Sequence, residues 1–162
     1  MSSFDRRTLL MLPLALAACG FTPVYGTGGN AQALRGQVLV DAPINRDSFL
    51  LVQNLEQRLG RASAARYALA LDLNVAEEGL AVTRQNVTAR INLVGTASYA
   101  LRDLTTGNVV HSGSVENFTG YSTTGSTVET LAAERDARAR LMTILADQIT
   151  TRLYAVADLP AA

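Results

Sequence analysis

The strongest constraint on the fold is a strict apolar–polar alternation in the middle of the chain. Every second residue there is large and apolar: Tyr67, Leu69, Leu71, Leu73 and Val75. Because successive side chains of a strand point to opposite faces, a period of two predicts a β-strand with one buried face. The pattern breaks at Glu77-Glu78-Gly79, which we interpret as a solvated turn, and resumes at Leu80 and Val82.

Two further strands are predicted on either side of a turn. The alternation returns between Ala89 and Arg102, and Val109–Tyr121 is a weaker fourth strand. The turn residues Asp103–Asn108 between them predict an antiparallel hairpin. Gly113 and Gly120 are candidate positions for β-bulges in the fourth strand.

A helix is predicted between the apolar segment Gln37–Val40, which we interpret as the first strand, and the long alternating strand. Its apolar residues share one helical face: Leu51, Val52, Leu55 and Leu59. Its candidate caps are Asn45, Asp47 or Ser48 at the start and Gly60 at the end. A strand–helix–strand unit has a right-handed crossover, so the first two strands should be parallel.

A second, longer helix is predicted after the fourth strand. Ser126 and Glu129 have the spacing of a capping box at its start. Its apolar stripe consists of Leu141, Leu145, Ile149, Leu153 and Val156. Its arginines fall mainly off this stripe, so we expect a solvated face at Arg135, Arg138, Arg140 and Arg152. The order predicts an α+β fold, β-α-β-β-β-α, with a four-stranded mixed sheet and two helices packed on one face.

The N-terminal segment has the features of a bacterial lipoprotein signal. Arg6-Arg7 precedes the apolar run Leu9–Ala17, which is shorter than the about 20 residues needed to cross a bilayer. Leu16–Cys19 reads Leu-Ala-Ala-Cys, the lipobox pattern, in which the chain is cut between Ala18 and Cys19. We expect a diacylglycerol on the Cys19 thiol and an acyl chain on its new α-amino group.

This signal also predicts the domain organisation and the location. We expect a removed signal peptide at 1–18, the lipidated cysteine and a flexible tether at 19–33, an α+β domain at 34–158 and a C-terminal tail at 159–162. Two or more lipid chains anchor a protein stably. Gly20 follows the cysteine where an aspartate would favour the inner membrane, so we expect the periplasmic side of the outer membrane. Asp5–Leu10 resembles a twin-arginine signal, and the Sec and twin-arginine export routes both stay open.

The residue inventory argues against catalysis and nucleic-acid binding. The formal net charge is zero, whereas a nucleic-acid binder shows a basic stripe. His111 is the only histidine and Cys19 the only cysteine, so we expect no metal, no cofactor beyond the lipid on Cys19, and no enzymatic activity. The alternative is a lipid-anchored hydrolase that uses Ser122 and His111, but Gly120–Thr124 is one glycine short of a nucleophile elbow. We expect His111 to be a cross-strand polar residue.

Short motifs, in order along nearly the whole mature chain, carry a family resemblance. They are Cys19–Gly26, Asn54-Leu55 with Leu59, Tyr67 with Leu69, Thr83-Arg84, Ala97 to Asp103, Thr106-Gly107, Tyr121, Glu134–Ala137 and Arg152-Leu153. In these motifs the chain resembles the LptE family of lipopolysaccharide-assembly lipoproteins. The resemblance implies a non-enzymatic protein that plugs the outer-membrane β-barrel LptD, helps it to assemble and assists the insertion of lipopolysaccharide into the outer leaflet.

The resemblance also implies a lipopolysaccharide-binding site. In the family a basic residue between the second and third strands carries this role, and Arg84 matches that position. The family has a second basic site, but the segment of this chain that matches it, Tyr121–Thr124, carries no charge. Arg90, which the alternation places on the exposed face of the third strand, is a further candidate, because arginine forks suit the phosphates of lipid A. The alternative for Arg84 and Arg90 is that each is a solvated residue at a strand end.

A small, hydroxylated outer sheet face is the predicted contact with the barrel wall. Its residues are Asn92, Thr96, Ser98, Ser112 and Ser114. A wide barrel encloses an aqueous lumen that a compact polar domain can fill. The expected partners are an LptD-type barrel, lipopolysaccharide and the inner leaflet of the outer membrane, with no nucleic acid. The alternative from another class is a stand-alone outer-membrane lipoprotein that binds a lipid.

Overall fold

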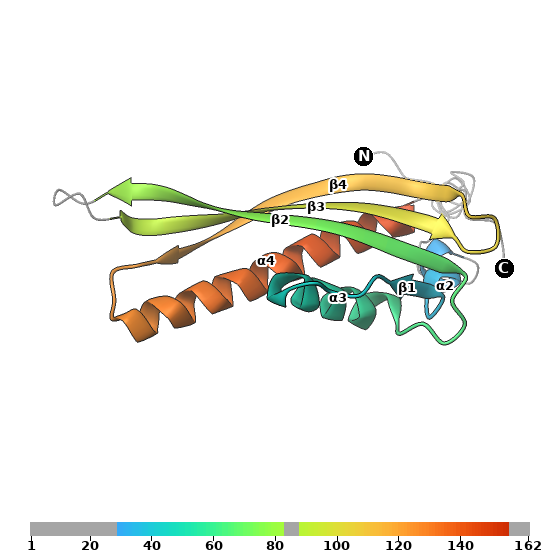
Figure 1. Ribbon diagram of the computed structural model, residues 1–162, viewed down its shortest axis with the longest axis horizontal. Coiled ribbons are helices and arrows are strands. Elements are labelled where there is room, and N and C mark those ends of the chain that lie inside the picture. The colour runs from blue at the N-terminus through green and yellow to red at the C-terminus, as the bar shows by residue number, and fades with distance from the viewer. Residues whose placement is uncertain (1–28, 83–87, 156–162) are drawn as a thin grey trace, which may run out of the picture.

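The computed structural model describes residues 29–82 and 88–155. Its elements are α2 (Asn30–Leu34), β1 (Val38–Val40), α3 (Arg46–Leu59), β2 (Tyr67–Val82), β3 (Thr88–Asp103), β4 (Val109–Ser122) and α4 (Thr127–Ala155). The strands form one sheet in the order β1-β2-β3-β4, and α3 and α4 lie side by side on one face of it (Figure 1). The predicted α+β fold with a four-stranded mixed sheet is therefore confirmed.

The strand pairing follows the predicted pattern. β1 pairs with β2 in parallel, with Val38 opposite Tyr67, as the right-handed crossover requires. β2 and β3 are antiparallel, and β3 and β4 form the predicted antiparallel hairpin. Because β1 has only three residues, it borders only the first residues of β2.

The predicted turn at Glu77-Glu78-Gly79 is wrong, because β2 continues through it. Glu77 pairs with Leu93, and Gly79 pairs with Ile91. The register becomes irregular only after Gly79. Tertiary pairing with β3 supplies the backbone hydrogen bonds that the local sequence does not specify, so the strand extends past its polar residues.

Both long helices begin at the capping residues that the sequence indicates. The Asn45 side chain accepts a hydrogen bond from Ser48 N over 2.8 Å, and the Ser48 hydroxyl lies 2.9 Å from Asn45 N as its acceptor. At α4, Ser126 N donates to the Glu129 carboxylate over 2.7 Å, which completes the predicted capping box with the reciprocal bond. Gly60 ends α3 with φ +78°, a backbone conformation that favours glycine.

The core lies between the sheet and the helices, and α4 packs closely against β3 at Gly95. Its fully buried side chains include Leu51 and Leu55 of α3, Leu69 and Leu101 of the sheet, and Leu141, Leu145 and Ile149 of α4. A Cβ at Gly95 would lie 2.9 Å from Leu141 Cδ2 and 3.1 Å from Leu145 Cδ1. Gly95 therefore allows α4 to pack directly on the sheet.

Helix α2 corrects the prediction of a flexible tether at 19–33, because it begins at Asn30. Ala31 and Leu34 of this short helix are buried, and α2 packs against α4. A helix of five residues shows no apolar periodicity, and in water it is too short to form alone. Packing against the core stabilises it.

The glycines of β4 do not mark bulges, which corrects that prediction. The register runs unbroken from Arg90 opposite Ser122 to Leu101 opposite His111, and it shifts only at the next pair. Gly113 instead lies against the ring of Tyr99, where a Cβ would approach the hydroxyl oxygen to 2.9 Å. The glycine thus makes room for an aromatic side chain of the neighbouring strand.

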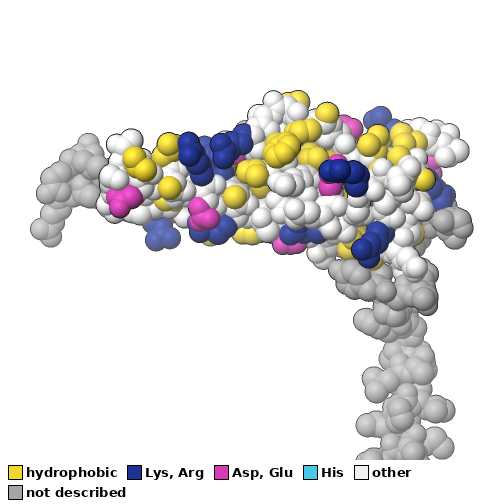
Figure 2. Space-filling model, turned by 90° about the horizontal axis from the view of Figure 1, so that it is seen from below, with side chains coloured by type: hydrophobic (Ala, Val, Ile, Leu, Met, Phe, Trp, Pro, Cys, Tyr) yellow, Lys and Arg dark blue, Asp and Glu magenta, His cyan; other side chains and the backbone are white. Residues whose placement is uncertain are grey.

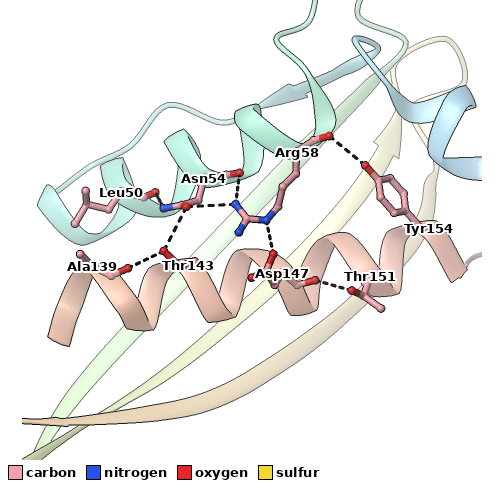
Figure 3. A network of polar contacts seen from close by, with 8 residues as sticks. All are labelled: Leu50, Asn54, Arg58, Ala139, Thr143, Asp147, Thr151 and Tyr154. Carbon is pink, nitrogen blue, oxygen red and sulfur yellow. Dashed lines mark hydrogen bonds and ion pairs between the residues drawn. The ribbon is translucent and has the colours of Figure 1, made fainter. Parts of the chain in front are cut away.

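A polar network joins α3 to α4, and the sequence patterns did not indicate it (Figure 3). Arg58 of α3 donates to the Asn54 carbonyl over 2.8 Å and forms an ion pair with Asp147 of α4. The Tyr154 hydroxyl donates to the Arg58 carbonyl over 3.2 Å. These contacts fix the two helices relative to each other along their shared side.

Candidate functional site

The domain is elongated, with two ends that differ in what they carry. β2 and β3 each have 16 residues, which corresponds to about 50 Å of extended chain. α2, the β3–β4 turn and the C-terminal end of α4 lie at one end (Figure 1). The end of β4 and the start of α4 lie toward the other, which we call the distal end.

Two of the predicted site regions fall outside the described residues. Ala18 and Cys19, the predicted cleavage and lipidation positions, precede Gly29, the first residue that the structure describes. Arg84 lies between β2 and β3, in the segment 83–87 that is also outside the description. The lipidation and the role of Arg84 stay predictions.

Arg90 lies near the distal end, on the sheet face that points away from the helices. It is exposed, and it pairs with Ala81 of β2 and Ser122 of β4. The neighbouring Gly120 leaves room for it, because a Cβ there would lie 3.4 Å from Arg90 Nε and 2.9 Å from Asn92 Oδ1. Arg90 can therefore present its guanidinium to an anion in solution.

The small polar residues predicted on the outer sheet face do lie there, and we call them the outer sheet surface: Asn92, Thr96, Ser98, Ser112 and Ser114. The Ser98 and Ser114 hydroxyls lie 3.4 Å apart across β3 and β4. The Thr96 hydroxyl donates to Glu116 over 3.3 Å. A shallow hollow of 400 Å³ near its distal part is bordered by Val94 and by Phe118, whose side chain is largely exposed.

His111 is a cross-strand polar residue, as predicted. Its Nε2 lies 3.1 Å from the Tyr99 hydroxyl, in a hollow of 420 Å³ that Arg152 also lines. Burial raises the pKa of Tyr99, and the nearby Arg152 guanidinium acts in the opposite direction. At neutral pH Tyr99 is therefore a neutral hydrogen-bonding partner of His111.

The two residues of the hydrolase alternative are far apart. Ser122 and His111 lie near opposite ends of β4, which separates them by roughly 35 Å along the strand. The Ser122 hydroxyl instead hydrogen bonds with Thr124 Oγ1 over 2.8 Å. A nucleophile must lie within hydrogen-bonding distance of its base, so these residues cannot form a Ser-His pair.

The prediction that the arginines of α4 lie on a solvated face is wrong for Arg138. Its guanidinium donates to Asp47 at the start of α3, to Glu77 on β2 and to Glu134 on α4 itself. Burial lowers the pKa of Arg138, but the bonds to Glu134 and Asp47 outweigh burial and raise it. Arg138 thus joins α4, α3 and β2. Because its partners Asp47 and Glu77 are far from it in the sequence, only the tertiary structure reveals this role.

The helix-bearing face carries no single-sign charged patch in the view of Figure 2. Arginine and carboxylate side chains are interspersed along it, with apolar side chains between them. In the described ranges no three His, Cys, Asp or Glu side chains group closely enough to hold a metal ion. No helix in those ranges is both long and apolar enough to span a membrane.

The structure is a small α+β domain with an extended sheet surface and two distinct ends. The family model of LptE, described as lipopolysaccharide-assembly, matches residues 35–153. The chain belongs to the LptE family. No curated protein sequence matches it.

Three solved lipoprotein structures share the fold. A candidate lipoprotein from Caulobacter crescentus is 21% identical with a TM-score of 0.65, and the match covers 76% of this chain and 92% of that one. Rare lipoprotein B from Shewanella oneidensis is 12% identical with a TM-score of 0.56, covering 72% and 91%. A minor lipoprotein from Acinetobacter baumannii is 20% identical with a TM-score of 0.54, covering 78% and 93%.

Proposed function

We propose that this chain is a lipid-anchored outer-membrane protein that occupies the lumen of an LptD-type β-barrel. In this role it helps the barrel to assemble and assists the insertion of lipopolysaccharide into the outer leaflet. The observation that carries the proposal is the match of residues 35–153 to the lipopolysaccharide-assembly family. The lipobox at Leu16–Cys19 supports the anchor.

The shape of the domain is compatible with such a plug. Its long strands give it a length of about 50 Å, and large barrels enclose an aqueous lumen. Cys19 is only ten residues before Gly29, so the anchor lies within about 35 Å of that residue. In our proposal the end with α2 lies near the inner leaflet and the distal end points away from it.

The outer sheet surface is the proposed contact with the barrel wall. Its short side chains allow the backbone of a facing strand to approach closely, and its hydroxyl and amide groups can form hydrogen bonds with polar residues of a lumen. Ser98 and Ser114 lie at its centre and are both exposed. A bulky side chain there would separate the two surfaces.

Lipopolysaccharide contact is proposed for Arg90, at the distal end, and for Arg84. Arg90 is exposed on the outer face, and arginine binds phosphate with a planar fork of donors. Arg84 is included from the family resemblance alone. The two residues are candidates for contact with the phosphates of lipid A as it passes the plug.

Affinity purification of the native lipoprotein from outer membranes tests the plug role. We expect a large β-barrel to co-purify with the wild-type chain and less of it with Ser98→Trp. The control is Thr105→Trp, since Thr105 is exposed in the β3–β4 turn away from the outer sheet surface. A wild-type chain that purifies without a barrel would refute the proposal, and equal barrel yields from both variants would refute the contact surface.

A further inference from the structure

The sheet has two long edges whose backbone groups face away from any neighbouring strand. β1 pairs only with Tyr67–Leu69, so the rest of β2 forms one edge, and β4 forms the other. Figure 1 shows β2 extending well beyond β1 toward the distal end. Free strand edges are templates for pairing with another chain, and native proteins usually block or cover them.

The residues whose backbone groups face the free edge of β2 follow from its pairing with β1. Tyr67 N donates to the Gln37 carbonyl over 3.0 Å, and the Leu69 carbonyl accepts from Asp41 N over 3.0 Å. Alternate residues of a strand direct their N–H and C=O groups to the same side. The register is unbroken as far as Gly79, so the edge groups belong to Leu71, Leu73, Val75, Glu77 and Gly79.

The edge of β4 is blocked by polar side chains. The Arg152 guanidinium donates to the Ser114 carbonyl over 2.6 Å, and Arg140 donates to the Gly120 carbonyl over 3.4 Å. The Asn117 side chain accepts from Phe118 N over 2.8 Å. Side chains thus form hydrogen bonds with backbone groups at three places along this edge.

Within residues 29–82 and 88–155, the edge of β2 has no such protection beyond the loop that follows β1. The segment Asp41–Asn45 lines a narrow hollow beside Leu71 and Leu73. From Leu73 to Gly79, no backbone group on this edge has a hydrogen-bonding partner among the described residues. One edge of the sheet is therefore blocked and the other is left open.

We propose that the edge of β2 from Leu73 to Gly79 binds an extended segment of a partner protein as an added strand. Strand addition uses backbone hydrogen bonds for affinity and alternate side chains for specificity. Leu73 and Val75 are half-buried on the helix side of the sheet, so the added strand directs apolar residues to that side. Asp72 and Glu78 are exposed on the outer side, so its outward residues are basic.

The same charges argue against a second copy of this chain as the occupant. If two β2 edges paired antiparallel about Val75, Asp72 of each copy would lie opposite Glu78 of the other. If they paired about Glu77, that carboxylate would lie opposite itself. Like charges directly opposite each other destabilise a strand pair.

The edge is also held in place before a partner binds. Glu77 forms an ion pair with Arg138 of α4, which also pairs with Asp47 of α3. These contacts attach the distal half of β2 to both helices. A pre-formed strand loses less conformational freedom on binding, which favours strand addition.

Peptide binding to the full-length lipidated protein in a neutral detergent tests the site. The probe is a fluorescent peptide of alternating valine and arginine that is long enough to pair with Leu73–Gly79. Its binding is measured by fluorescence anisotropy. We expect this peptide to bind. Two control peptides should bind at least about tenfold more weakly, which is about 1.4 kcal/mol. One is N-methylated on the amides that face β2, and the other has glutamate in place of arginine. Equal binding of either copy would overturn the proposal.

Two protein variants locate the binding site. Val75→Pro removes a backbone N–H group from the open edge of β2. Ser112→Pro is the control, because it removes a backbone N–H group from the edge of β4. Proline is tolerated on edge strands. We expect at least a tenfold loss only in Val75→Pro. Asp72→Arg combined with Glu78→Arg should reverse the preference toward the glutamate peptide, which keeps the test valid if Val75→Pro does not fold.

Three results would overturn the proposal. The first is unchanged arginine-peptide binding in folded Val75→Pro, and the second is an unchanged preference in the charge-reversed variant. The third is sedimentation of the wild-type chain as a dimer that Val75→Pro dissociates, because the occupant would then be a second copy.

Discussion

Arg138 Nη1 on α4 donates to Asp47 Oδ2 at the start of α3 over 2.8 Å. The same guanidinium reaches Glu77 of β2, so a single side chain joins both helices to the long strand. Its side chain is 24% exposed, which places the ion pairs at the margin of the core. Arg138 therefore contacts both the strand that carries the open edge and the two helices that pack on the sheet.

We expect Arg138→Met to destabilise the domain by about 2 kcal/mol, because three carboxylates lose their common partner at a partly buried site. Urea unfolding followed by circular dichroism measures the change. Arg135→Met is the matched control, since Arg135 is exposed on the same helix. A loss of similar size in both variants would show that the effect belongs to helix propensity and not to the ion pairs.

Gly95→Val should destabilise the domain by about 1–3 kcal/mol, because the new side chain would meet Leu141 and Leu145 of α4. The free energy of unfolding in urea gives the size of the effect. Ala100→Val on the outer side of the same strand should change it by no more than about 0.5 kcal/mol. If both valines are tolerated equally, α4 does not pack on β3 at Gly95.

Acid should weaken the β3–β4 turn through Asp103. Hydrogen bonds from the backbone N–H groups of Thr106 and Thr105 lower the pKa of the Asp103 carboxyl below its usual value of 3.8. The folded state therefore binds protons less readily than the unfolded state, so this stabilisation is complete above about pH 4 and is lost as the pH falls through the lowered pKa.

Asp103→Asn tests this pH dependence. We expect its free energy of unfolding to fall less steeply below pH 4 than that of the wild type, in urea titrations at a series of pH values. Asp72→Asn is the control, since Asp72 is an exposed carboxylate on β2. A parallel decline in the wild type and Asp103→Asn would contradict the assignment of the low pKa to the turn.

Arg90→Glu should reduce binding of purified lipopolysaccharide several-fold, because a carboxylate would replace a phosphate-binding guanidinium at the distal end. Surface-immobilised protein and lipopolysaccharide aggregates of known concentration provide the measurement. Arg102→Glu makes the same charge change on the same exposed face but at the other end of β3. Equal losses in the two variants would indicate a general charge effect and remove Arg90 from the proposed site.

Local patterns were sufficient for most of the fold. Three patterns each predicted an element from residues close together in the chain. They are the alternation from Tyr67 to Val75, the capping box at Ser126 and Glu129, and the apolar stripe of α4. His111 was also assigned correctly, because its place on an alternating strand indicates a cross-strand partner.

The misinterpreted elements share a physical cause. α2 exists because Ala31 and Leu34 are buried against other elements, and β2 continues past Glu77 because β3 and Arg138 stabilise it. At the candidate site, the sequence placed Arg90 on the outer face correctly. It could not show that only one sheet edge is blocked.

The sequence by itself determined that there are four strands and two long helices, their order and the lipobox, because each of these depends on residues close together in the chain. Only the tertiary structure decided which charged side chains become structural, where the short helix packs and which strand edge stays open. Those features depend on contacts such as Arg138 with Asp47 and Arg152 with Ser114, whose partners are far apart in the sequence.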